Sequence, residues 1–311
     1  GVRVVDDGRF GFAHLVDASA AEKAVQQAVA IAKKSPSVSG FVLPSEQPAE
    51  DVSGRMDKHI LDIGPEDLLE QADTVLSHVR STDERAVVTG GGVGVSATAS
   101  CLMNSEGILS SGITTSHGIG VQVSIDVDGQ LTSSWQGQSS RSLLPAVPEC
   151  VSRAVHWAQV TQNPLNVESS AVETPVLLTS EGFSPLFSMV VPPAMTGEKM
   201  VRKESFWSES MGKEVLNPSL SLHDDGLLNG GMSSGPRDAE GVPRRRQTLV
   251  ENGTLSNMLW STRDAAQQVA EGRIEDASST GSASSGGHQS PPSTGCTELF
   301  LTSSQPSMTM E

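Results

Sequence analysis

The stretch Gly235–Thr262, GPRDAEGVPRRRQTLVENGTLSNMLWST, decides how the last part of the chain folds. Two runs rich in β-forming residues, 247–250 and 254–259, flank an Asn-Gly pair. Asn-Gly readily adopts the positive φ angles of a tight primed turn, so this is the clearest hairpin signal in the sequence. Just upstream, residues 238–243 (DAEGVP) place two carboxylates and a glycine turn where a loop would lie over a cleft.

The chain before this hairpin opens with a short strand pair and a helix. Residues 2–16 predict two strands that turn at an Asp-Gly pair, and an amphipathic helix follows. Ser19 and Glu22 have the spacing of a capping box at the start of this helix. Residues 35–59 are rich in Pro and Ser, which is typical of a connector. We therefore expect an incomplete N-terminal α/β portion over residues 1–50.

The middle of the chain predicts an antiparallel meander backed by two helices. Helical patterns cover about residues 65–80 and 148–160, whereas residues 85–136 change to a period of two. This places a central α+β domain over residues 60–163. One face of its best-defined strand is expected to be buried through five alternating residues: Ile119, Val121, Val123, Ile125 and Val127.

The remainder predicts a third, β-rich domain over residues 172–311. Residues 174–179 and 297–301 have strand character. Residues 276–295, DASSTGSASSGGHQSPPSTG, have the low complexity of a flexible loop. The last residues, 307–311, resemble the cap and first turn of a helix, so we expect this domain to be truncated.

The charge balance disfavours direct binding to nucleic acid. Lys and Arg total 21 against 37 Asp and Glu, which gives a formal net charge of −16. A phosphate backbone requires clustered cations, and base stacking requires aromatic residues, of which Tyr is absent. The one basic cluster, residues 244–246, is interpreted as a solvated strand edge.

The same composition predicts a cytoplasmic protein that does not enter membranes. No run approaches the roughly 20 apolar residues that span a bilayer, and the first residues lack the pattern of a signal peptide. The three cysteines, Cys101, Cys150 and Cys296, are widely spaced and odd in number. This favours reduced, mostly buried thiols over a disulfide framework or a zinc cluster.

Motifs for metal, phosphate or nucleophile chemistry are weak. The seven histidines are scattered, and none stands four residues from another. His223-Asp224-Asp225 offers ligand types, but three consecutive residues rarely face one ion, so a turn is the simpler interpretation. The glycine run 89–96 lacks the Gly-Lys-Ser/Thr ending of a phosphate loop and predicts a bulged strand or mobile loop. A Gly-x-Ser-x-Gly elbow is missing.

The order of these segments resembles the TldD/PmbA family, whose members are described as modulators of DNA gyrase and as metalloproteases. The resemblance rests on the acidic loop, the Glu-Gly-Val run, the basic strand, the "ENG" turn and Ser279-Thr280-Gly281. Further matches are residues 1–13 (GVRVVDDGRFGFA), 203–206 (KESF) and 210–215 (SMGKEV). The likeness covers most of the chain and implies the α+β architecture of that family, with two to three domains. Family members extend beyond both ends of this sequence.

The family's catalytic TldD branch carries a His-Glu-x-x-x-His zinc motif on a helix near residues 181–195. This chain has no histidine between His156 and His223, and Pro192-Pro193 is expected to interrupt a regular helix. The resemblance therefore implies the PmbA branch, called TldE in the heterodimer, which lacks the motif. Such a protein has no catalytic residue, metal ligand or cofactor of its own. We expect zinc on a TldD-like partner subunit and a dimer that binds peptide.

The resemblance also places a peptide-binding cleft around two segments. We expect its walls to include the acidic turn and the Ser-Thr-Gly segment, and an edge strand of the hairpin is expected to pair with an extended peptide. The predicted cleft residues are Asp238, Glu240, Gly241, Ser279, Thr280 and Gly281.

Three functions remain open from the sequence. The first is a noncatalytic partner subunit of a cytoplasmic metalloprotease that processes peptides, such as modified-peptide precursors or the antidotes of toxin systems. The second is a divergent metallopeptidase that is active alone. The third is a regulatory binding protein that acts on gyrase or on a toxin-antidote system through protein contact. Co-purification with a TldD-like subunit, zinc content and unaided peptide cleavage distinguish them.

Overall fold

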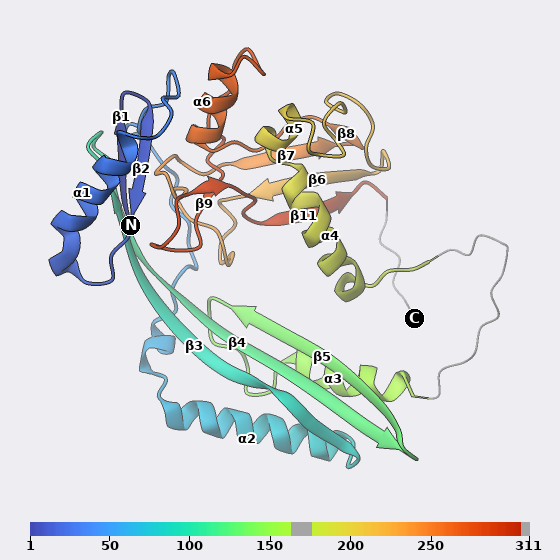
Figure 1. Cartoon of the computed structure of the whole chain (residues 1–311). Coiled ribbons are helices and arrows are strands. Elements are labelled where there is room, and N and C mark those ends of the chain that lie inside the picture. Colours follow the sequence, from blue (N-terminus) through green and yellow to red (C-terminus); the bar gives the residue numbers. More distant parts are fainter. Residues whose placement is uncertain (163–175, 306–311) are drawn as a thin grey trace.

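The chain folds into three groups of helices and strands, and a long two-stranded ribbon reaches from the second group to the other two (Figure 1). The structure, a computed structural model, describes residues 1–162 and 176–305. The sheets in these ranges are antiparallel, and helices pack against them. The α+β class predicted from the sequence is therefore confirmed.

The first group is a β-hairpin covered by one helix, as predicted. The helix lies so close to the hairpin that a β-carbon at Gly11 would be 1.8 Å from the carbonyl oxygen of Ala28. The capping box predicted at Ser19 is wrong, because a 3-10 turn comes first and Asp17 accepts the Ser19 amide instead. The elements are β1 (Val2–Asp6), β2 (Arg9–Ala13), η1 (Ala18–Ala20) and α1 (Ala21–Ala32).

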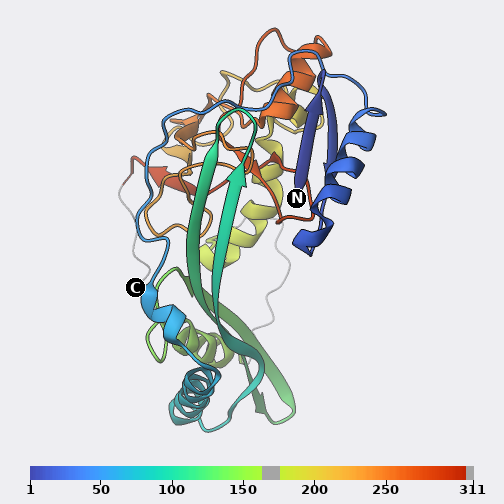
Figure 2. The ribbon, with the colours of Figure 1, turned by 90° about the vertical axis from the view of Figure 1, so that its left-hand side faces the viewer.

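The connector that follows runs along the other groups without helix or strand of its own. Residues 33–57, all of which the structure describes, contain only one β-bridge, between Ser37 and Arg9. The connector passes the tip of the ribbon (Figure 2), where the side-chain amide of Asn104 donates to the Pro44 carbonyl at 2.7 Å. It ends in the 3-10 helix η2 (Lys58–Asp62), so the predicted connector is confirmed.

The second group is a three-stranded sheet with two helices against one face. Strand order is β3-β4-β5. The predicted buried face of β4 is confirmed, since Ile119, Val121, Val123 and Ile125 are at most 4% exposed, but Ser124 on the face expected to be wet is also buried. Small residues of α3 allow the helix to approach this face. The elements are α2 (Pro65–Thr82), β3 (Ala86–Met103), β4 (Leu109–Val127), β5 (Gln130–Ser140) and α3 (Glu149–Val160).

Two strands of this sheet continue as the ribbon. β5 ends opposite His117, whereas β3 and β4 remain paired as far as Met103 and Leu109. At the tip, Ile108 is 1% exposed and packs beside Gly241 of the third group. The glycine run 89–96 lies within β3, with a bulge at its start, so the bulged-strand interpretation is confirmed.

The third group is a four-stranded sheet, in the order β11-β6-β7-β8, with helices and a small hairpin around it. The predicted Asn-Gly turn is confirmed, since Asn252 and Gly253 have φ angles of 45° and 82°. The elements are α4 (Ser180–Ala194), α5 (Gly197–Val201), β6 (Leu220–Asp225), β7 (Arg246–Glu251), β8 (Thr254–Leu255), α6 (Thr262–Ala270), β9 (Ala283–Ser284), β10 (Ser293–Thr294) and β11 (Leu299–Ser303).

Five sequence predictions for this group need correction or fall on residues outside the described part of the chain. Residues 176–179 form no strand, and 174–175 are outside the described residues, as is the predicted helix start at 307–311. The predicted interruption at Pro192-Pro193 is wrong, since α4 continues through both prolines to Ala194. The second strand of the hairpin is only two residues long. The expected flexible loop contains the β9-β10 pair and buried residues.

Across residues 1–162 and 176–305, no helix is both long and apolar enough to cross a membrane.

Candidate functional site

The acidic turn predicted from the sequence is closed by one buried carboxylate. Asp238 is 4% exposed, and its Oδ1 accepts the backbone amides of Glu240 and Val242, both at 2.9 Å. Gly241 has a φ of 97°, and a β-carbon there would lie 2.8 Å from Ile108 at the ribbon tip. Glycine at this position therefore serves both the turn and the close contact with the ribbon.

The Ser-Thr-Gly segment lies beside this turn, as expected. Oδ2 of Asp238 accepts the amide of Ala283 at 3.0 Å, and Ala239 and Ala283 share a backbone hydrogen bond. Gly281 has a φ of 74°, and a β-carbon there would lie 2.3 Å from the carbonyl oxygen of Pro243. The two segments are thus joined through the backbone and through one carboxylate.

The hydroxyl groups of this segment point inward. Thr280 Oγ1 accepts the amide of Trp260 at 2.8 Å, and Ser279 Oγ lies 3.4 Å from the Trp260 carbonyl. Ser279 also caps its own turn through the Gly281 amide. The structure therefore brings the six predicted residues together, and these contacts give them a structural role. Their predicted role in peptide binding stays a prediction.

The second acid of the turn meets the start of a helix. Glu240 is 9% exposed, and its Oε2 accepts the amide of Thr262, the first residue of α6, at 2.6 Å. A carboxylate is favoured at a helix N-terminus, where amides have no partner within the helix. Burial raises the pKa of Glu240, and the Thr262 amide opposes that rise. Burial likewise raises the pKa of Asp238, although the Ala283 amide opposes it.

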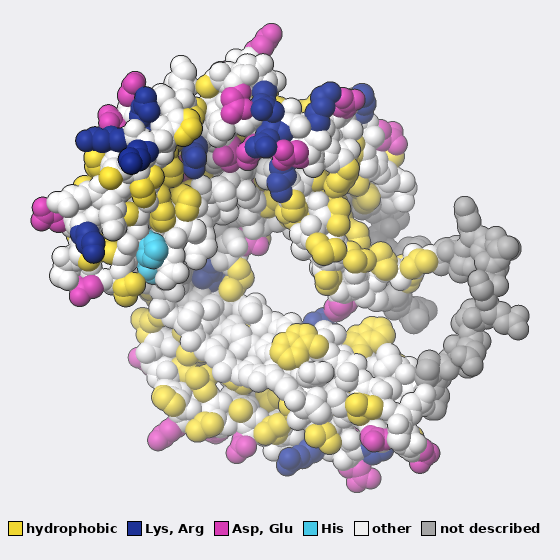
Figure 3. All heavy atoms as spheres, viewed as in Figure 1, with side chains coloured by type: hydrophobic (Ala, Val, Ile, Leu, Met, Phe, Trp, Pro, Cys, Tyr) yellow, Lys and Arg dark blue, Asp and Glu magenta, His cyan; other side chains and the backbone are white. Residues whose placement is uncertain are grey.

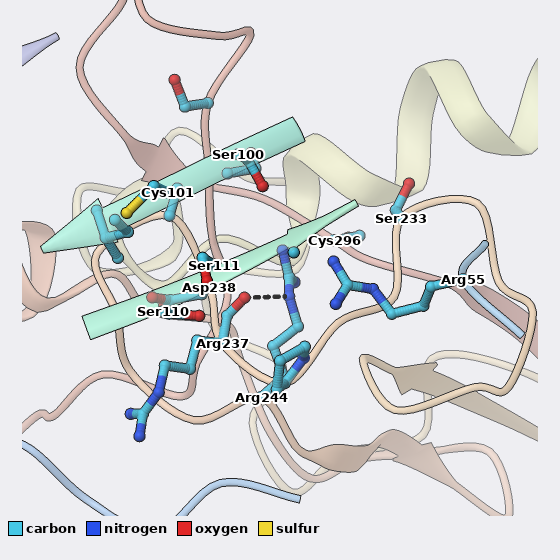
Figure 4. A pocket seen from close by; sticks show the side chains of 16 residues that line it. Arg55, Ser100, Cys101, Ser110, Ser111, Ser233, Arg237, Asp238, Arg244 and Cys296 are labelled. Atoms are coloured by element: carbon cyan, nitrogen blue, oxygen red, sulfur yellow. Dashed lines mark hydrogen bonds between the residues drawn. The ribbon is translucent and has the colours of Figure 1, made fainter. Parts of the chain in front are cut away.

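A cavity of about 460 Å³ opens between this turn, the ribbon and the connector. Asp238 and Ala239 form one wall, the ribbon residues Ser111 and Gly112 another, and Arg55 enters from the connector (Figure 4). Glu240, Ser279, Thr280 and Gly281 are not part of its lining. The cavity therefore lies next to the predicted cleft residues and is lined by only one of them.

Arg244 crosses the floor of this cavity. Its Nε donates to the Arg237 carbonyl at 3.2 Å, and its Nη1 donates to Thr297 Oγ1 at 2.6 Å. Burial lowers its pKa, while Asp238 and Asp224 raise it. The prediction of a solvated basic edge is thus wrong for Arg244, whose side chain is partly buried in a network of charges, and is confirmed for the exposed residues 245 and 246.

Asp224 supports this floor from β6. It is 1% exposed, and its Oδ1 accepts the amides of Thr297 and Glu298 at 2.7 and 2.9 Å. Burial raises the pKa of Asp224. Its neighbour His223 lies between the hydroxyl groups of Thr248 and Thr302, at 3.1 and 2.9 Å. These partners explain the His-Asp-Asp run without a metal ion.

Arg237 fastens the turn to the connector. Its Nη1 donates to the Gly241 carbonyl at 2.9 Å, and its Nη2 donates to Gln47 O at 2.6 Å and to the Glu46 carboxylate. In Figure 4 its side chain runs away from Arg55 and Arg244. Arg237 is therefore a structural clamp at the rim of the cavity.

Two cysteines line the cavity, and all three cysteines are free. Cys101 is exposed, contrary to the predicted burial, whereas Cys150 is buried. Burial raises the pKa of Cys296 to about 12, so its thiol stays protonated at neutral pH. Cys296 is therefore not the thiolate that a cysteine nucleophile requires.

The helix α4 does not fit a zinc ion. Of the ligand types that zinc takes, its fifteen residues supply one carboxylate, Glu181, and neither histidine nor cysteine. Glu181 instead pairs with Arg153 of α3 at 3.1 Å. Within the described parts of the chain, no group of three His, Cys, Asp or Glu side chains could hold a metal ion.

Instead, α4 presents apolar side chains to solvent. Leu186, Met189 and Val190 are 55%, 71% and 47% exposed. On the sheet of the second group, Trp135 of β5 is 59% exposed and lies over Gly120. Figure 3 shows hydrophobic side chains gathered in both regions. Exposed apolar side chains that gather in this way are typical of interaction sites.

Comparison with known families matches both ends of the chain to domains of a single family. Residues 171–310 match the family description "PmbA/TldA metallopeptidase C-terminal domain", and residues 1–32 match "PmbA/TldA metallopeptidase domain 1". Both matches fall on segments whose motifs carried the resemblance seen in the sequence.

Individual relatives agree with these domains. An uncharacterized protein of Methanocaldococcus jannaschii is 28% identical over 92% of this chain and 64% of its own length. The metalloprotease PmbA of Escherichia coli O157:H7 is 27% identical over 85% of this chain and 60% of its own length. The chain therefore spans about three fifths of the length of these two relatives.

Solved structures share the fold. The crystal structure of TldE from Thermococcus kodakarensis superposes with a TM-score of 0.82 at 23% identity, over 98% of this chain and 68% of that one. A Thermotoga maritima structure, described as a proposed modulator of a DNA gyrase, gives a TM-score of 0.76 at 21% identity, over 92% and 64%.

Proposed function

Because the chain belongs to the PmbA/TldD family, we propose that it is a PmbA/TldE-like subunit that is not catalytic by itself. It pairs in the cytoplasm with a TldD-like subunit that carries the zinc, and it helps hold the peptide that this partner cleaves. It makes no direct contact with nucleic acid.

The observation that carries the proposal is the make-up of α4. The resemblance implies that the catalytic branch places its zinc ligands on this helix, yet here it has no histidine and no cysteine. Zinc sites for hydrolysis need three protein ligands and an open position for water. Glu181 alone, already paired with Arg153, does not meet that requirement.

The exposed apolar surfaces support an assembly. In the monomer, Leu186 and Met189 on α4 and Trp135 on β5 keep apolar area exposed to water. Covering such side chains stabilises an interface by about 25 cal/mol per Å² of apolar area, before the cost of association. We propose that a TldD-like subunit covers part of this surface.

The cavity supports contact with a peptide. Its walls combine hydroxyl groups, one carboxylate and arginine side chains, which suits the polar backbone of an extended chain. The expected pairing of a peptide with β8 is wrong, because Leu255 already donates its amide to the Lys213 carbonyl at 3.0 Å and accepts the Gly212 amide at 2.8 Å. In this proposal the buried Asp238 and Glu240, with the partly buried Ser279, hold the wall in place.

The test is reconstitution of the pair. The chain and a TldD-like subunit from the same genome are purified separately, mixed, and examined by light scattering coupled to size-exclusion chromatography. We expect a heterodimer, zinc only on the partner by elemental analysis, and turnover of an unfolded peptide only by the mixture. A Leu186→Glu, Met189→Glu double variant of the exposed face should weaken the heterodimer, whereas Leu61→Glu, also exposed but on η2, should not.

Other outcomes would replace the proposal. Stoichiometric zinc in the isolated chain, together with unaided cleavage, would favour a divergent self-sufficient metallopeptidase. The name of the Thermotoga maritima relative motivates a third candidate, a regulatory protein that acts on gyrase by protein contact. Binding of the isolated chain to gyrase, without any association with a TldD-like subunit, would favour that candidate.

A further inference from the structure

Arg55 enters the cavity from the connector and is held at its backbone. Its carbonyl accepts the amide of Thr115 on β4 at 3.1 Å. Its guanidinium fits between two glycines: a β-carbon would lie 3.3 Å from Nη1 at Gly112 and 3.7 Å from Cζ at Gly235. Larger residues at either position would restrict the guanidinium, so both glycines leave it room inside the cavity.

The guanidinium of Arg55 has donors without acceptors. Its Nε is buried and has no hydrogen-bond partner among the described residues, and no carboxylate of these residues forms an ion pair with it. The neighbouring Arg237 and Arg244 both donate to named acceptors. An arginine carries five donors and stays charged, and buried donors without acceptors are costly. Arg55 is thus poised for an acceptor that residues 1–162 and 176–305 do not provide.

The surrounding charges favour an anion at this point. The Arg55 and Arg244 guanidinium groups point toward one another in Figure 4. Burial lowers the pKa of both Arg244 and Arg141, and the nearby charge of Arg55 lowers each pKa further. The contribution of Arg55 is repulsion between like charges, which an anion between the groups would relieve. Hydroxyl groups of Ser111 and Ser233 also line the cavity and could donate to the same anion.

We propose that this cavity binds a carboxylate group of a peptide, with Arg55 as its principal ligand and Arg244 as the second. Arginine recognises carboxylates through paired N–H donors in a matching planar geometry. A single negative charge fits better than a phosphate dianion, because Asp238 and Asp224 already face Arg244 from the other side. The choice of a peptide as the carrier rests on the proposed function.

The test uses short peptides with an uncharged methoxycoumarin label at the N-terminus. One hexapeptide of Ala, Ser and Gln ends in a free carboxylate and its twin ends in an amide. A third is amidated and carries one internal Glu. Fluorescence anisotropy with the purified full chain at low ionic strength should show the free acid binding about tenfold or more tighter than the amide. Tight binding of the third peptide as well would extend the site to side-chain carboxylates.

Two variants test the role of Arg55 in different ways. Arg55→Gln removes the charge, and Gly112→Asp places a carboxylate of the chain itself within reach of Nη1. Both variants should abolish the difference in affinity between the free-acid and amidated peptides, because the first removes the cation and the second pairs it with a carboxylate of the chain. Arg245→Gln, an exposed arginine outside the cavity, should preserve the difference. Circular dichroism establishes that each variant is folded.

Several results would overturn the assignment. Equal binding of acid and amide by the unaltered chain would exclude a carboxylate site while leaving peptide binding intact. Retention of the difference in both variants would exclude Arg55. If neither peptide binds, the carboxylate site falls, and the proposed function is then judged separately by peptide turnover in the reconstituted pair. Displacement by inorganic phosphate at far lower concentrations than acetate would show a phosphate site instead.

Discussion

The second and third groups bury very different interiors. Beneath the three-stranded sheet, the contacts are almost wholly apolar, as between β4 and α3. Beneath the acidic turn, Asp224, Asp238 and Glu240 are buried at 1%, 4% and 9% exposure, with Arg244 between two of them. The first interior excludes water from hydrocarbon, whereas the second satisfies charges with backbone amides.

The two interiors also differ in how their contacts are distributed along the sequence. In the apolar interior, the buried side chains of β4 alternate along the strand, and those of α3 recur along one face of the helix. The polar contacts instead span 45 residues between Asp238 and Ala283 and 73 between Asp224 and Thr297. Removing one apolar side chain should leave a local cavity, while removing one carboxylate should leave several donors without acceptors in distant segments.

The largest expected effect is that of Asp238→Ala. Three amides lose their acceptor, and hydrogen bonds to charged groups contribute about 1.5–3 kcal/mol each, so the third group should lose about 4 kcal/mol or more of unfolding free energy. Hydrogen exchange of β7 amides across a urea series, measured by mass spectrometry, would show it. The exposed Asp73→Ala should cost no more than about 0.5 kcal/mol.

If Asp238→Ala lowered the unfolding free energy by less than about 1 kcal/mol, buried carboxylates would not be what stabilises the third group. The amides would then be satisfied by water, and the turn would not be a charged interior. Protection of β4 amides in the same sample serves as the internal control, because β4 lies in the other interior.

The matching change in the apolar interior is Ile125→Ala. Ile125 is fully buried against the helices, and truncation of such a side chain typically lowers the unfolding free energy by about 2–5 kcal/mol. We expect about 3 kcal/mol, read from the exchange of β4 amides. Val87→Ala, 58% exposed on the adjacent strand, should cost less than about 1 kcal/mol. Equal losses in the two variants would mean that burial on this sheet is not what stabilises it.

The two interiors should respond to pH with opposite signs. In the second group, burial lowers the pKa of His117, whose ring lies between Gln71 and the Leu144 amide. Its unfolded form therefore binds protons more readily, so stability is full above about pH 6.5 and is lost as the pH falls. The hydrogen bond from Arg85, with that from Gln159, holds the pKa of Asp83 well below its ordinary value, which adds to the loss in acid.

In the third group, burial raises the pKa of Asp224, Asp238 and Glu240. The folded state then binds protons more readily, so stability is greatest below the ordinary carboxyl pKa of about 4 and falls as the pH rises through the raised values. Exchange measured from pH 7.5 down to 5, corrected for the intrinsic rate, should show β4 losing protection and β7 keeping or gaining it.

The pH contrast has its own control. His117→Gln removes the titrating ring, so the acid loss in the second group should become shallower, while the response of β7 stays the same. A common pH response in both groups would show that they unfold as one cooperative unit, and the comparison would then apply only to local contacts.

The sequence predicted what is encoded locally. The buried face of β4 from Ile119 to Ile125 and the Asn252-Gly253 turn were both confirmed, because a period of two and a positive φ are properties of neighbouring residues. The hairpin was nevertheless predicted too long. Ser256 and Asn257 both donate their amides to Leu249, which ends the regular pairing after two residues.

Long-range polar packing gave no such signal. Residues 276–295 were expected to be flexible because they are small and polar, yet Ser282 is 1% exposed and Gly281 passes close to Pro243. Small residues occur here because backbones approach one another. The six predicted cleft residues were found adjacent through resemblance alone. Arg55 was missed, since one arginine in a connector is recognisable only when the ribbon and Gly112 lie beside it.

The smallest expected effect sharpens the comparison within the apolar interior, where one neutral hydrogen bond joins β5 to α3. Thr132 Oγ1 donates to the Ala158 carbonyl at 2.7 Å, near the end of the helix. Thr132→Val keeps the shape and removes the donor, and a neutral hydrogen bond contributes about 1 kcal/mol, so the second group should lose about that much. Thr132→Ser keeps the hydroxyl and should retain most of it. A loss above about 3 kcal/mol in the valine variant, measured by exchange of α3 amides, would mean that polar contacts dominate both interiors, because a single neutral bond would then be as important as the carboxylate of Asp238.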